Sequence, residues 1–323
     1  MKALRVHSWE PGAGIAMDDV PVPEPAAGEI RVRVQAAGIS FVDLLLARGE
    51  YQLRPPLPFV AGSEFSGVVD AIGPDTPTPL RVGDPVCGVR QGAWAELVCV
   101  PAERVHLRTR KDGEAEAAVV TSAYSTSLYS LRERGALRAG ETLLVLGASG
   151  AVGHAAVQLG RWMGARVIAG ASTAAKQQAA RAAGAHEVFD SGGDWKDAVK
   201  RLAGPGGVDV CFDPVGGAAT DIGFRTLGWE GRHLMVGFAG GEIPALKANL
   251  AIVKGASLVG VDVRQFGQKQ PERAAAIQRE CVALFNAGDV QPLVRAVLPV
   301  ERFDEAARLA SERGACGRVL FTF

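Results

Sequence analysis

The stretch from Leu143 to His154 constrains this chain more than any other segment. It opens with four apolar residues, Leu143 to Leu146, a run typical of a strand buried on both faces of a parallel sheet. Three glycines at spacing three follow, and apolar residues then recur at helical spacing. A strand, a glycine turn and a helix start leave unpaired N–H groups at the positive end of a helix dipole. We therefore predict a pyrophosphate site bound by Gly147, Ser149, Gly150, Ala151, Val152 and Gly153.

The glycine pattern departs from the dinucleotide fingerprint at one position. With Gly150 as the middle glycine and Gly153 as the last, the first position holds Ala148. A glycine triplet alone is a weak signal, because such loops also serve only as turns. The strand before it, the helix after it and a second strand at residues 166–169 favour cofactor binding.

Composition narrows the class of protein. The chain has 323 residues, which suggests two domains, and no net formal charge, which gives no reason to expect nucleic acid or an acidic membrane as partner. Its five cysteines lie far apart, so neither a zinc knuckle nor a disulfide scaffold is indicated. The sequence has no apolar run of about 18 residues and no signal-peptide core near Met1. We expect a cytoplasmic protein that acts on a small molecule.

The first third predicts a small β-barrel or closed sheet. Short strands bounded by glycine and proline are expected at residues 4–7, 30–35, 67–73, 84–89 and 95–100. A short helix is expected at residues 40–48, with Phe41, Leu44 and Leu45 on one face.

From Glu141 the pattern alternates between strand and helix. Strands are predicted at residues 143–146, 166–169, 187–189, 208–212, 233–236 and 257–261, with helices centred near Val157, Gln178, Val199, Gly223 and Leu250. This rhythm indicates a doubly wound α/β sheet of two mononucleotide halves. Two helices, at residues 114–120 and 127–134, precede it.

The last sixty residues break this rhythm. Helices are expected at residues 274–286 and 303–309, the second capped by Asp304, and strands at 294–298 and 318–322. These elements do not complete a domain of their own. We therefore assign residues 1–117 and 262–323 to one domain and residues 118–261 to the inserted nucleotide domain.

The end of the second parallel strand bears on cofactor choice. An NAD enzyme usually places an acid there for the ribose 2′-hydroxyl, but this chain has Ser172 and Thr173, with Lys176 about one helical turn later. That set suits a 2′-phosphate, and so NADPH. The alternative is that Ser172 only caps the next helix and Lys176 is solvated.

Two further loops follow the fourth and fifth parallel strands, whose carboxyl ends face the ligand in open α/β sheets. Asp213 begins the first loop and either faces the ligand or caps the turn. Gly237 and Phe238 begin the second, which either admits a nicotinamide near its backbone or is an ordinary loop.

Four segments together resemble the medium-chain dehydrogenase/reductase superfamily, in its zinc-free quinone oxidoreductase (zeta-crystallin-like) branch. Residues 37–51 resemble the family stretch GxNxxDxxxRxGxY, and residues 58–67 resemble PGxExxG. The loop 147–153 resembles AxxGxxG, and residues 237–241 with the ending 317–319 also fit. The segments occur in the family's order across nearly the whole chain.

The resemblance implies a Rossmann domain inserted in a GroES-like β-barrel catalytic domain, with an active cleft between them, NADPH as cofactor and a homodimer or homotetramer. Zinc members have a cysteine at or beside Ser40 and a histidine at Ser63, so no catalytic zinc is expected here. By family position Thr126 contacts the nicotinamide. Two departures are Ser40 in place of asparagine and the loss of a phosphate-binding tyrosine near Asp190.

These observations predict an NADPH-dependent reductase of quinones or activated alkenes. Ser40 and Tyr51 are the candidate donors to the oxygen that gains charge. The alternative for each is structural: Ser40 only caps the short helix, and Tyr51 only packs in its loop. Two other functions stay open: an enoyl-thioester reductase of the same superfamily, and a crystallin-like protein that binds the cofactor without turnover.

Overall fold

A computed structural model of the chain describes residues 1–9, 14–312 and 316–323, and these form two compact units. Of the described residues, the first unit contains residues 1–9, 14–122, 278–312 and 318–323, and the second contains residues 123–277 and 316–317. Residues 118–122 thus group with the first unit and residues 262–277 with the second, unlike in our sequence assignment. The chain changes unit inside two long helices, α2 (Glu114–Leu128) and α9 (Pro271–Ala287), and helices of this length carry no sequence signal for a boundary within them.

The second unit is built on a parallel sheet of six strands. Their order is β11 (Glu187–Asp190), β10 (Arg166–Ala171), β9 (Thr142–Val145), β12 (Val208–Asp213), β13 (Leu227–Met235) and β14 (Ser257–Gly260). All five pairings are parallel. The order reverses between β9 and β12, which makes that point the topological switch where doubly wound sheets bind ligands.

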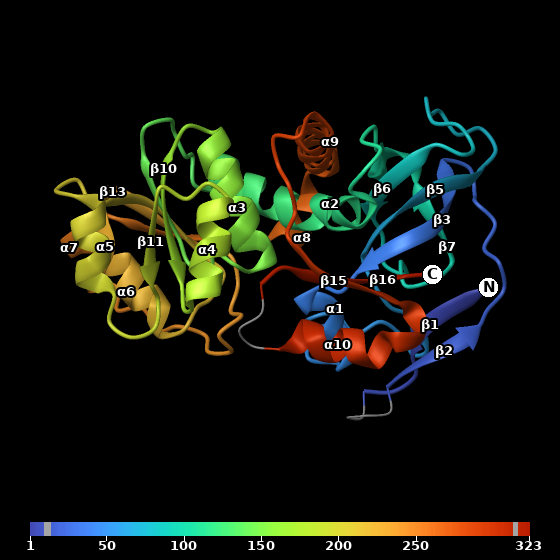
Figure 1. Cartoon of the computed structure of the whole chain (residues 1–323), viewed down its shortest axis with the longest axis horizontal. Coiled ribbons are helices and arrows are strands. Elements are labelled where there is room, and N and C mark those ends of the chain that lie inside the picture. Colours follow the sequence, from blue (N-terminus) through green and yellow to red (C-terminus); the bar gives the residue numbers. More distant parts are fainter. Residues whose placement is uncertain (10–13, 313–315) are drawn as a thin grey trace. The chain divides into compact units, whose positions relative to one another are not determined.

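Helices cover both faces of this sheet, as Figure 1 shows, with α3 and α4 on one face and α5 and α6 on the other. Their bounds are α3 (Ala151–Trp162), α4 (Ala174–Ala182), α5 (Lys196–Ala203), α6 (Ala218–Thr226) and α7 (Asn249–Lys254). Strands buried on both faces need apolar residues at every position, and Leu143, Leu144 and Val145 are fully buried. The predicted strands and helices of this sheet are all present.

The first unit contains two sheets. The smaller has the order β2 (Ile15–Asp19), β1 (Lys2–Val6) and β4 (Phe59–Val60). The larger has the order β15 (Val294–Pro299), β16 (Arg318–Thr322), β3 (Glu29–Gly38), β5 (Glu64–Ile72), β6 (Pro85–Val89) and β8 (Val105–Leu107), and β7 (Leu97–Pro101) also pairs with β3. The final strand β16 lies antiparallel to β3, so the predicted return of the chain to its first sheet is observed.

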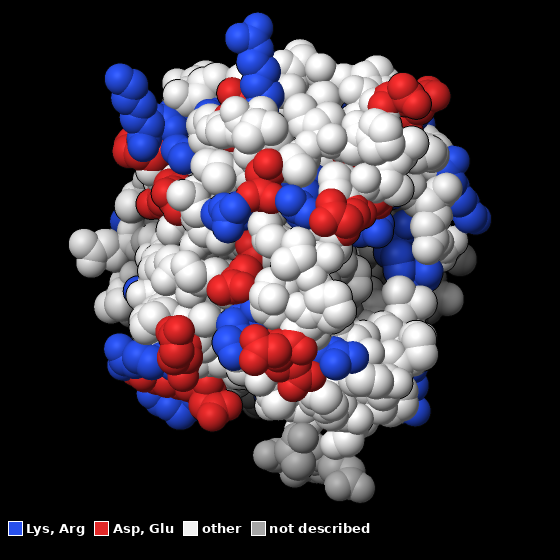
Figure 2. All heavy atoms as spheres, turned by 90° about the vertical axis from the view of Figure 1, so that its right-hand side faces the viewer, with Lys and Arg blue, Asp and Glu red and all other residues white. Residues whose placement is uncertain are grey.

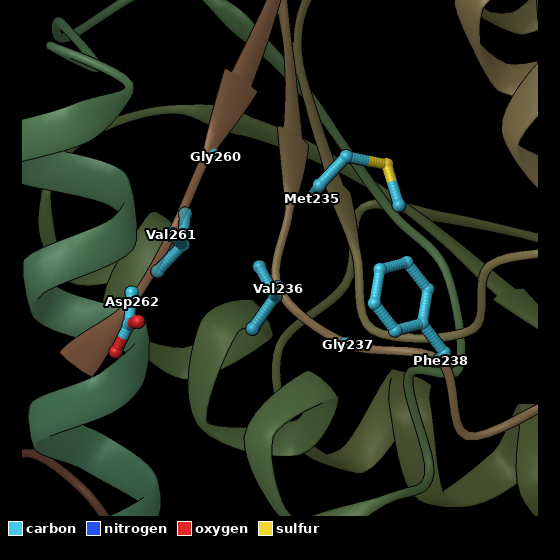
Figure 3. A pocket seen from close by; sticks show the side chains of 7 residues that line it. All are labelled: Met235, Val236, Gly237, Phe238, Gly260, Val261 and Asp262. Carbon is cyan, nitrogen blue, oxygen red and sulfur yellow. The ribbon is translucent and has the colours of Figure 1, made fainter. Parts of the chain in front are cut away.

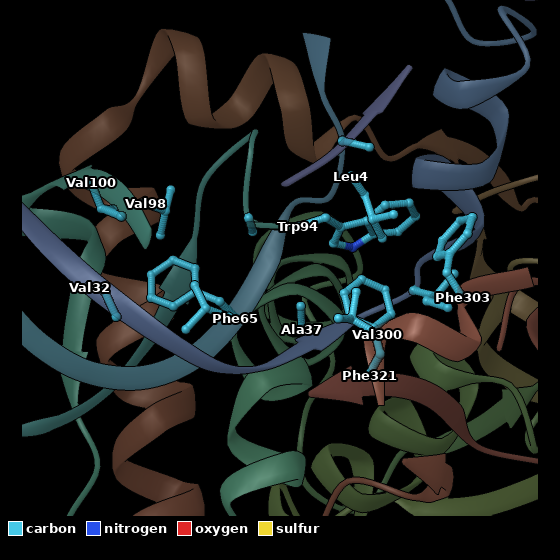
Figure 4. Close-up of a cluster of buried hydrophobic side chains, with 14 of the residues drawn as sticks. Leu4, Val32, Ala37, Phe65, Trp94, Val98, Val100, Val300, Phe303 and Phe321 are labelled. Atoms are coloured by element: carbon cyan, nitrogen blue, oxygen red, sulfur yellow. The ribbon is translucent and has the colours of Figure 1, made fainter. Parts of the chain in front are cut away.

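An aromatic group lies at the centre of the first unit's core (Figure 4). The Trp94 ring lies 5.3 Å from the rings of both Phe303 and Phe321, and its Nε1 donates to the carbonyl of Gly38 at 3.0 Å. Phe303 begins α10 (Phe303–Ser311) and Phe321 lies on β16. The C-terminal segment is therefore part of this core.

The helices differ from the sequence prediction in three details. The helices predicted at 114–120 and 127–134 are one run, α2 followed directly by the π-helical turn η2 (Tyr129–Arg134). Helix α8 (Val263–Lys269) was not predicted. Helix α10 begins after Arg302 without a side-chain cap. Asp304, the predicted cap, lies inside the first turn, where its negative charge interacts favourably with the helix dipole.

Surface charge is mixed. On the face that Figure 2 shows, lysine and arginine side chains alternate with aspartate and glutamate side chains, and the chain's formal charges cancel. Across the described residues, no helix has both the length and the apolar character that crossing a bilayer requires.

Candidate functional site

The glycine loop between β9 and α3 has the geometry of an anion site. Gly147 has φ of 59°, and Gly150 is the extended N-cap of α3. A Cβ on Gly153 would lie 2.2 Å from the carbonyl oxygen of Gly147, so only glycine lets the helix pack this closely on the loop. The first helical bond runs from the His154 N–H to the Gly150 carbonyl at 2.8 Å, so the preceding N–H groups point out of the helix start.

Ala148 replaces the first glycine of the fingerprint without disturbing this loop. Ala148 is fully buried, and its N–H donates to the carbonyl of Gly170 on β10 at 3.1 Å. The loop is therefore fixed to the second strand through its backbone, where a methyl side chain is no obstacle.

Ser172 and Lys176 meet at the end of β10, as a shared phosphate site requires. Lys176 Nζ donates to Ser172 Oγ at 3.2 Å. Thr173, and not Ser172, is the N-cap of α4, because its Oγ1 accepts from the Lys176 N–H at 3.3 Å. Ser172 Oγ and Lys176 Nζ thus form a donor pair on the surface.

One acidic residue lies close to this pair. Asp190 ends β11 and is in register with Ala171, the last residue of β10. Its Oδ1 accepts from the Gly192 N–H at 2.8 Å, so the carboxylate is bonded within its own turn.

The loops after β12 and β13 are joined backbone to backbone. Ala239 N–H donates to the Pro214 carbonyl at 3.0 Å, and Gly240 N–H donates to the Val215 carbonyl at 2.8 Å. Beside the second loop lies a mostly apolar hollow of about 380 Å³, shown in Figure 3. Its lining residues are Met235, Val236, Gly237, Phe238, Gly260, Val261 and Asp262.

Asp213 is fully buried in the first loop. Its Oδ1 accepts from the N–H groups of Val215 and Gly216 at 2.9 and 3.0 Å, so the turn-capping interpretation of this residue is the one observed. Its second carboxylate oxygen is bonded to a buried histidine, His233, which the sequence analysis did not select. A lone histidine in a predicted strand gives no sign of which residue it will meet.

Thr126 lies near the C-terminal end of α2 rather than at the start of a second helix. The next residue, Ser127, donates from Oγ to the Val152 carbonyl at 2.8 Å. This bond holds the end of α2 against the first turn of α3, close to the glycine loop.

In the first unit, Ser40 is the N-cap of α1 (Phe41–Ala47). Its Oγ accepts from the Asp43 N–H at 3.0 Å, and Asp43 Oδ2 accepts from the Ser40 N–H at 2.8 Å. The helix-capping interpretation of Ser40 is therefore observed, and the Ser40 side chain also forms a hydrogen bond that acts on the Asp43 carboxyl. Tyr51 is half-buried in the loop after α1.

A buried charged cluster, not predicted from the sequence, stands behind Ser40. It consists of Asp43, Glu64 and Arg318, and the Arg318 guanidinium is paired with the Glu64 carboxylate. A Cβ on Gly38 would overlap Glu64 Oε1 at 2.2 Å, which explains the glycine in that segment. The signal that could have found the cluster is the placement of single charges inside otherwise apolar segments.

Burial governs ionisation in this cluster. Desolvation raises the pKa of Glu64 from 4.5 to about 7; Arg318 opposes the rise and Asp43 adds to it. Desolvation likewise raises the pKa of Asp43, against hydrogen bonds from Ser40 and Ser63. Among the described side chains, no three His, Cys, Asp or Glu residues are grouped to hold a metal ion.

Two family models match the chain. "Alcohol dehydrogenase GroES-like domain" matches residues 26–109, and "Zinc-binding dehydrogenase" matches residues 151–279. Quinone oxidoreductase-like protein 2 of Mus musculus is 35% identical over 300 residues, covering 91% of this chain and 85% of the mouse protein.

Solved structures match over the whole chain. A probable oxidoreductase from Mycobacterium abscessus has a TM-score of 0.89 and 33% identity, covering 100% of this chain and 99% of that one. A mycobacterial protein solved in complex with NADPH has a TM-score of 0.90 and 28% identity, covering 100% of both chains.

Proposed function

The chain belongs to the medium-chain dehydrogenase/reductase superfamily, in its quinone oxidoreductase branch, and we propose on that basis that it reduces a quinone or an activated alkene with NADPH and without zinc. The observation that carries the cofactor choice is the Ser172–Lys176 pair at the end of β10, where an NAD enzyme usually has an acid. The structure of a mycobacterial relative with NADPH supports the same choice.

The residues present fit this cofactor. At Gly150 the loop leaves open space, because the nearest atom to an added Cβ is 3.4 Å away, and the start of α3 directs N–H groups at the place of the pyrophosphate. Lys176 supplies a positive charge for the 2′-phosphate, and Ser172 supplies a hydroxyl. The hollow beside Phe238 is mostly apolar, which suits the face of a nicotinamide ring. Bound NADPH would supply the hydride.

The protein's part in the reaction is then to stabilise charge. An electron-poor quinone or enone becomes more negative at oxygen as it is reduced, and a hydroxyl donor placed there stabilises that charge. Ser40, which caps α1 by accepting from the Asp43 N–H, is one candidate donor. Tyr51 is the second candidate donor, in the loop that follows the helix which Ser40 caps.

We also propose that the protein is a homodimer in the cytoplasm, joined at β14. This strand is the edge of the six-stranded sheet, and an edge strand offers unpaired N–H and C=O groups to a second strand. Large apolar side chains are exposed on and near it, including Trp229, Ile252, Val253 and Leu258.

The test of the activity is a screen for NADPH oxidation across quinones, enones and enoyl thioesters, repeated after dialysis against a chelator. We expect turnover of quinones or enones that the chelator does not reduce. Turnover of enoyl thioesters alone would replace the proposal with the thioester reductase. NADPH binding, measured by its fluorescence, without turnover of any substrate would replace it with the crystallin-like function.

Tyr51→Phe tests the donor directly, because it keeps the ring and removes only the hydroxyl. We expect kcat to fall about hundredfold while NADPH affinity is unchanged. Tyr129→Phe is the matched control, since the Tyr129 ring is stacked on Phe266 at 4.1 Å and keeps that contact without its hydroxyl. If Tyr51→Phe keeps the wild-type kcat on every accepted substrate, Tyr51 is not a donor.

A further inference from the structure

A fully buried carboxylate–imidazole pair lies at the carboxyl ends of β12 and β13. His233 Nε2 is 3.0 Å from Asp213 Oδ2, and both residues have 0% exposure. Thr220 on α6 donates from Oγ1 to the same carboxylate oxygen at 2.6 Å. With the two backbone N–H groups on Oδ1, the carboxylate is bonded to four donors.

These donors keep Asp213 ionised. Burial raises the pKa of Asp213, but hydrogen bonds from His233, Thr220 and Gly216 more than offset it, and the pKa is lowered overall. A buried carboxylate that lost one donor would be left partly unsatisfied, which is costly in a dry interior. His233 is therefore a partner that Asp213 needs.

The same residue holds the second loop through its backbone. The carbonyl oxygen of Asp213 accepts from the Val236 N–H at 2.9 Å, which begins the ladder continued by the bonds of Ala239 and Gly240. The side chain of Asp213 thus fixes the first loop and its carbonyl fixes the second. A change in the orientation of the Asp213 carboxylate would therefore shift the backbone of residues 236–240.

The interior is shaped to hold the imidazole. A Cβ on Gly223 of α6 would lie 3.1 Å from His233 Cε1, so glycine at this position leaves the ring its space. Cys211 on β12 is the register partner of His233, yet none of the four hydrogen bonds to the Asp213 carboxylate described above comes from it. A substitution at Cys211 therefore changes the packing beside His233 without removing a hydrogen bond from Asp213.

We infer that His233 is a positioning residue: by orienting Asp213 it holds the backbone of residues 236–240 in the conformation that receives the nicotinamide ring. This inference rests on the proposed function for its ligand. It assigns His233 no contact with the cofactor or the substrate.

The test compares His233→Leu, which removes the donor, with His233→Gln, whose amide can donate to the same oxygen. Two ligands are used: NADPH, and adenosine 2′,5′-bisphosphate, which carries the phosphate end but no nicotinamide. We expect His233→Leu to weaken NADPH about tenfold and to leave the bisphosphate within twofold, and His233→Gln to recover most of the loss. Cys211→Ala is the matched control, expected to leave both affinities unchanged.

Hydrogen exchange on the protein without cofactor gives an independent readout. The amides of Val236, Ala239 and Gly240 should exchange faster in His233→Leu and not in Cys211→Ala. If His233→Leu does not fold, Thr220→Val removes a different donor to the same oxygen and should produce the same selective effect.

Three outcomes overturn the inference. In the first, His233→Leu, or Thr220→Val in its place, binds NADPH with wild-type affinity. In the second, the affinities for NADPH and for the bisphosphate fall in parallel, with no selective change in amide exchange. In the third, Cys211→Ala gives the same selective loss of NADPH affinity. A wild-type protein that binds neither ligand refutes the proposed function itself, and the inference with it. Failure of the inference is therefore seen in the variants, whereas failure of the proposed function is seen already in the wild type.

Discussion

Lys176 is the residue on which cofactor preference depends most. A charge-assisted bond to the 2′-phosphate exists only with NADPH. Lys176→Ala should therefore raise KM for NADPH by about ten- to hundredfold and leave KM for NADH within about twofold. Steady-state kinetics with both cofactors measures this. Lys196→Ala, at the start of α5, is the control for loss of a lysine. Equal weakening of both cofactors would remove Lys176 from the phosphate site.

Glu64 gives the protein a predicted pH dependence of stability. In the unfolded chain its carboxyl loses the proton near 4.5, whereas the folded protein keeps it to a pKa of about 7. Between these values the unfolded state binds fewer protons, so the free energy of unfolding falls as pH rises, by about 3 kcal/mol in all, and levels off above the folded pKa.

Glu64→Gln removes this titration while it keeps the size of the side chain. Chemical unfolding across the same pH range should then show a flatter profile than the wild type. Glu103→Gln, an exposed residue, is the control and should keep the wild-type slope. A Glu64→Gln profile as steep as that of the wild type contradicts the prediction.

At the scale of elements, the packing of α3 on its loop depends on two glycines in different ways. A Cβ on Gly153 would lie 2.2 Å from the Gly147 carbonyl, so Gly153→Ala must separate helix and loop and should cost about 1–3 kcal/mol of stability. On Gly150 the nearest atom to a Cβ is 3.4 Å away, and its φ of −77° suits alanine. Gly150→Ala should therefore fold normally and lose NADPH affinity, because the methyl group enters the pyrophosphate space.

Thermal unfolding and NADPH titration of both variants separate these effects. A stable Gly153→Ala protein, or a Gly150→Ala protein with wild-type affinity, would show that the loop does not act as argued. The contrast tests the cradle itself, apart from any residue at the reacting end.

For the whole molecule, β14 is the expected contact between two copies. Leu258→Lys places a charge on the exposed edge strand and should convert a dimer to a monomer in sedimentation experiments. Val82→Lys adds the same charge at another exposed apolar residue of the chain and should leave the dimer intact. A dimer that persists in Leu258→Lys would place the interface elsewhere.

Much of the second unit follows from its sequence because its signals are local. The apolar run Leu143 to Leu146 predicts a buried strand, and the glycines after it predict a turn. The later strands alternate with helices in the same way. The strands β2, β4 and β8 escaped prediction because they are short and defined by their pairing partners rather than by their own residues.

The strands and helices of the second unit, the glycine loop and the Ser172–Lys176 pair could be predicted from the sequence, since each depends on residues that are close along the chain. Which buried charges meet depends on the folded chain: Arg318 pairs with Glu64, 254 residues away in sequence, and His233 contacts Asp213 from the next strand of the sheet. The physical reason is that hydrophobic spacing specifies which face of an element is buried. The partner of a charge on that face is fixed by strand pairing, register and the space left by residues such as Gly38 and Gly223, none of which is visible in a local pattern.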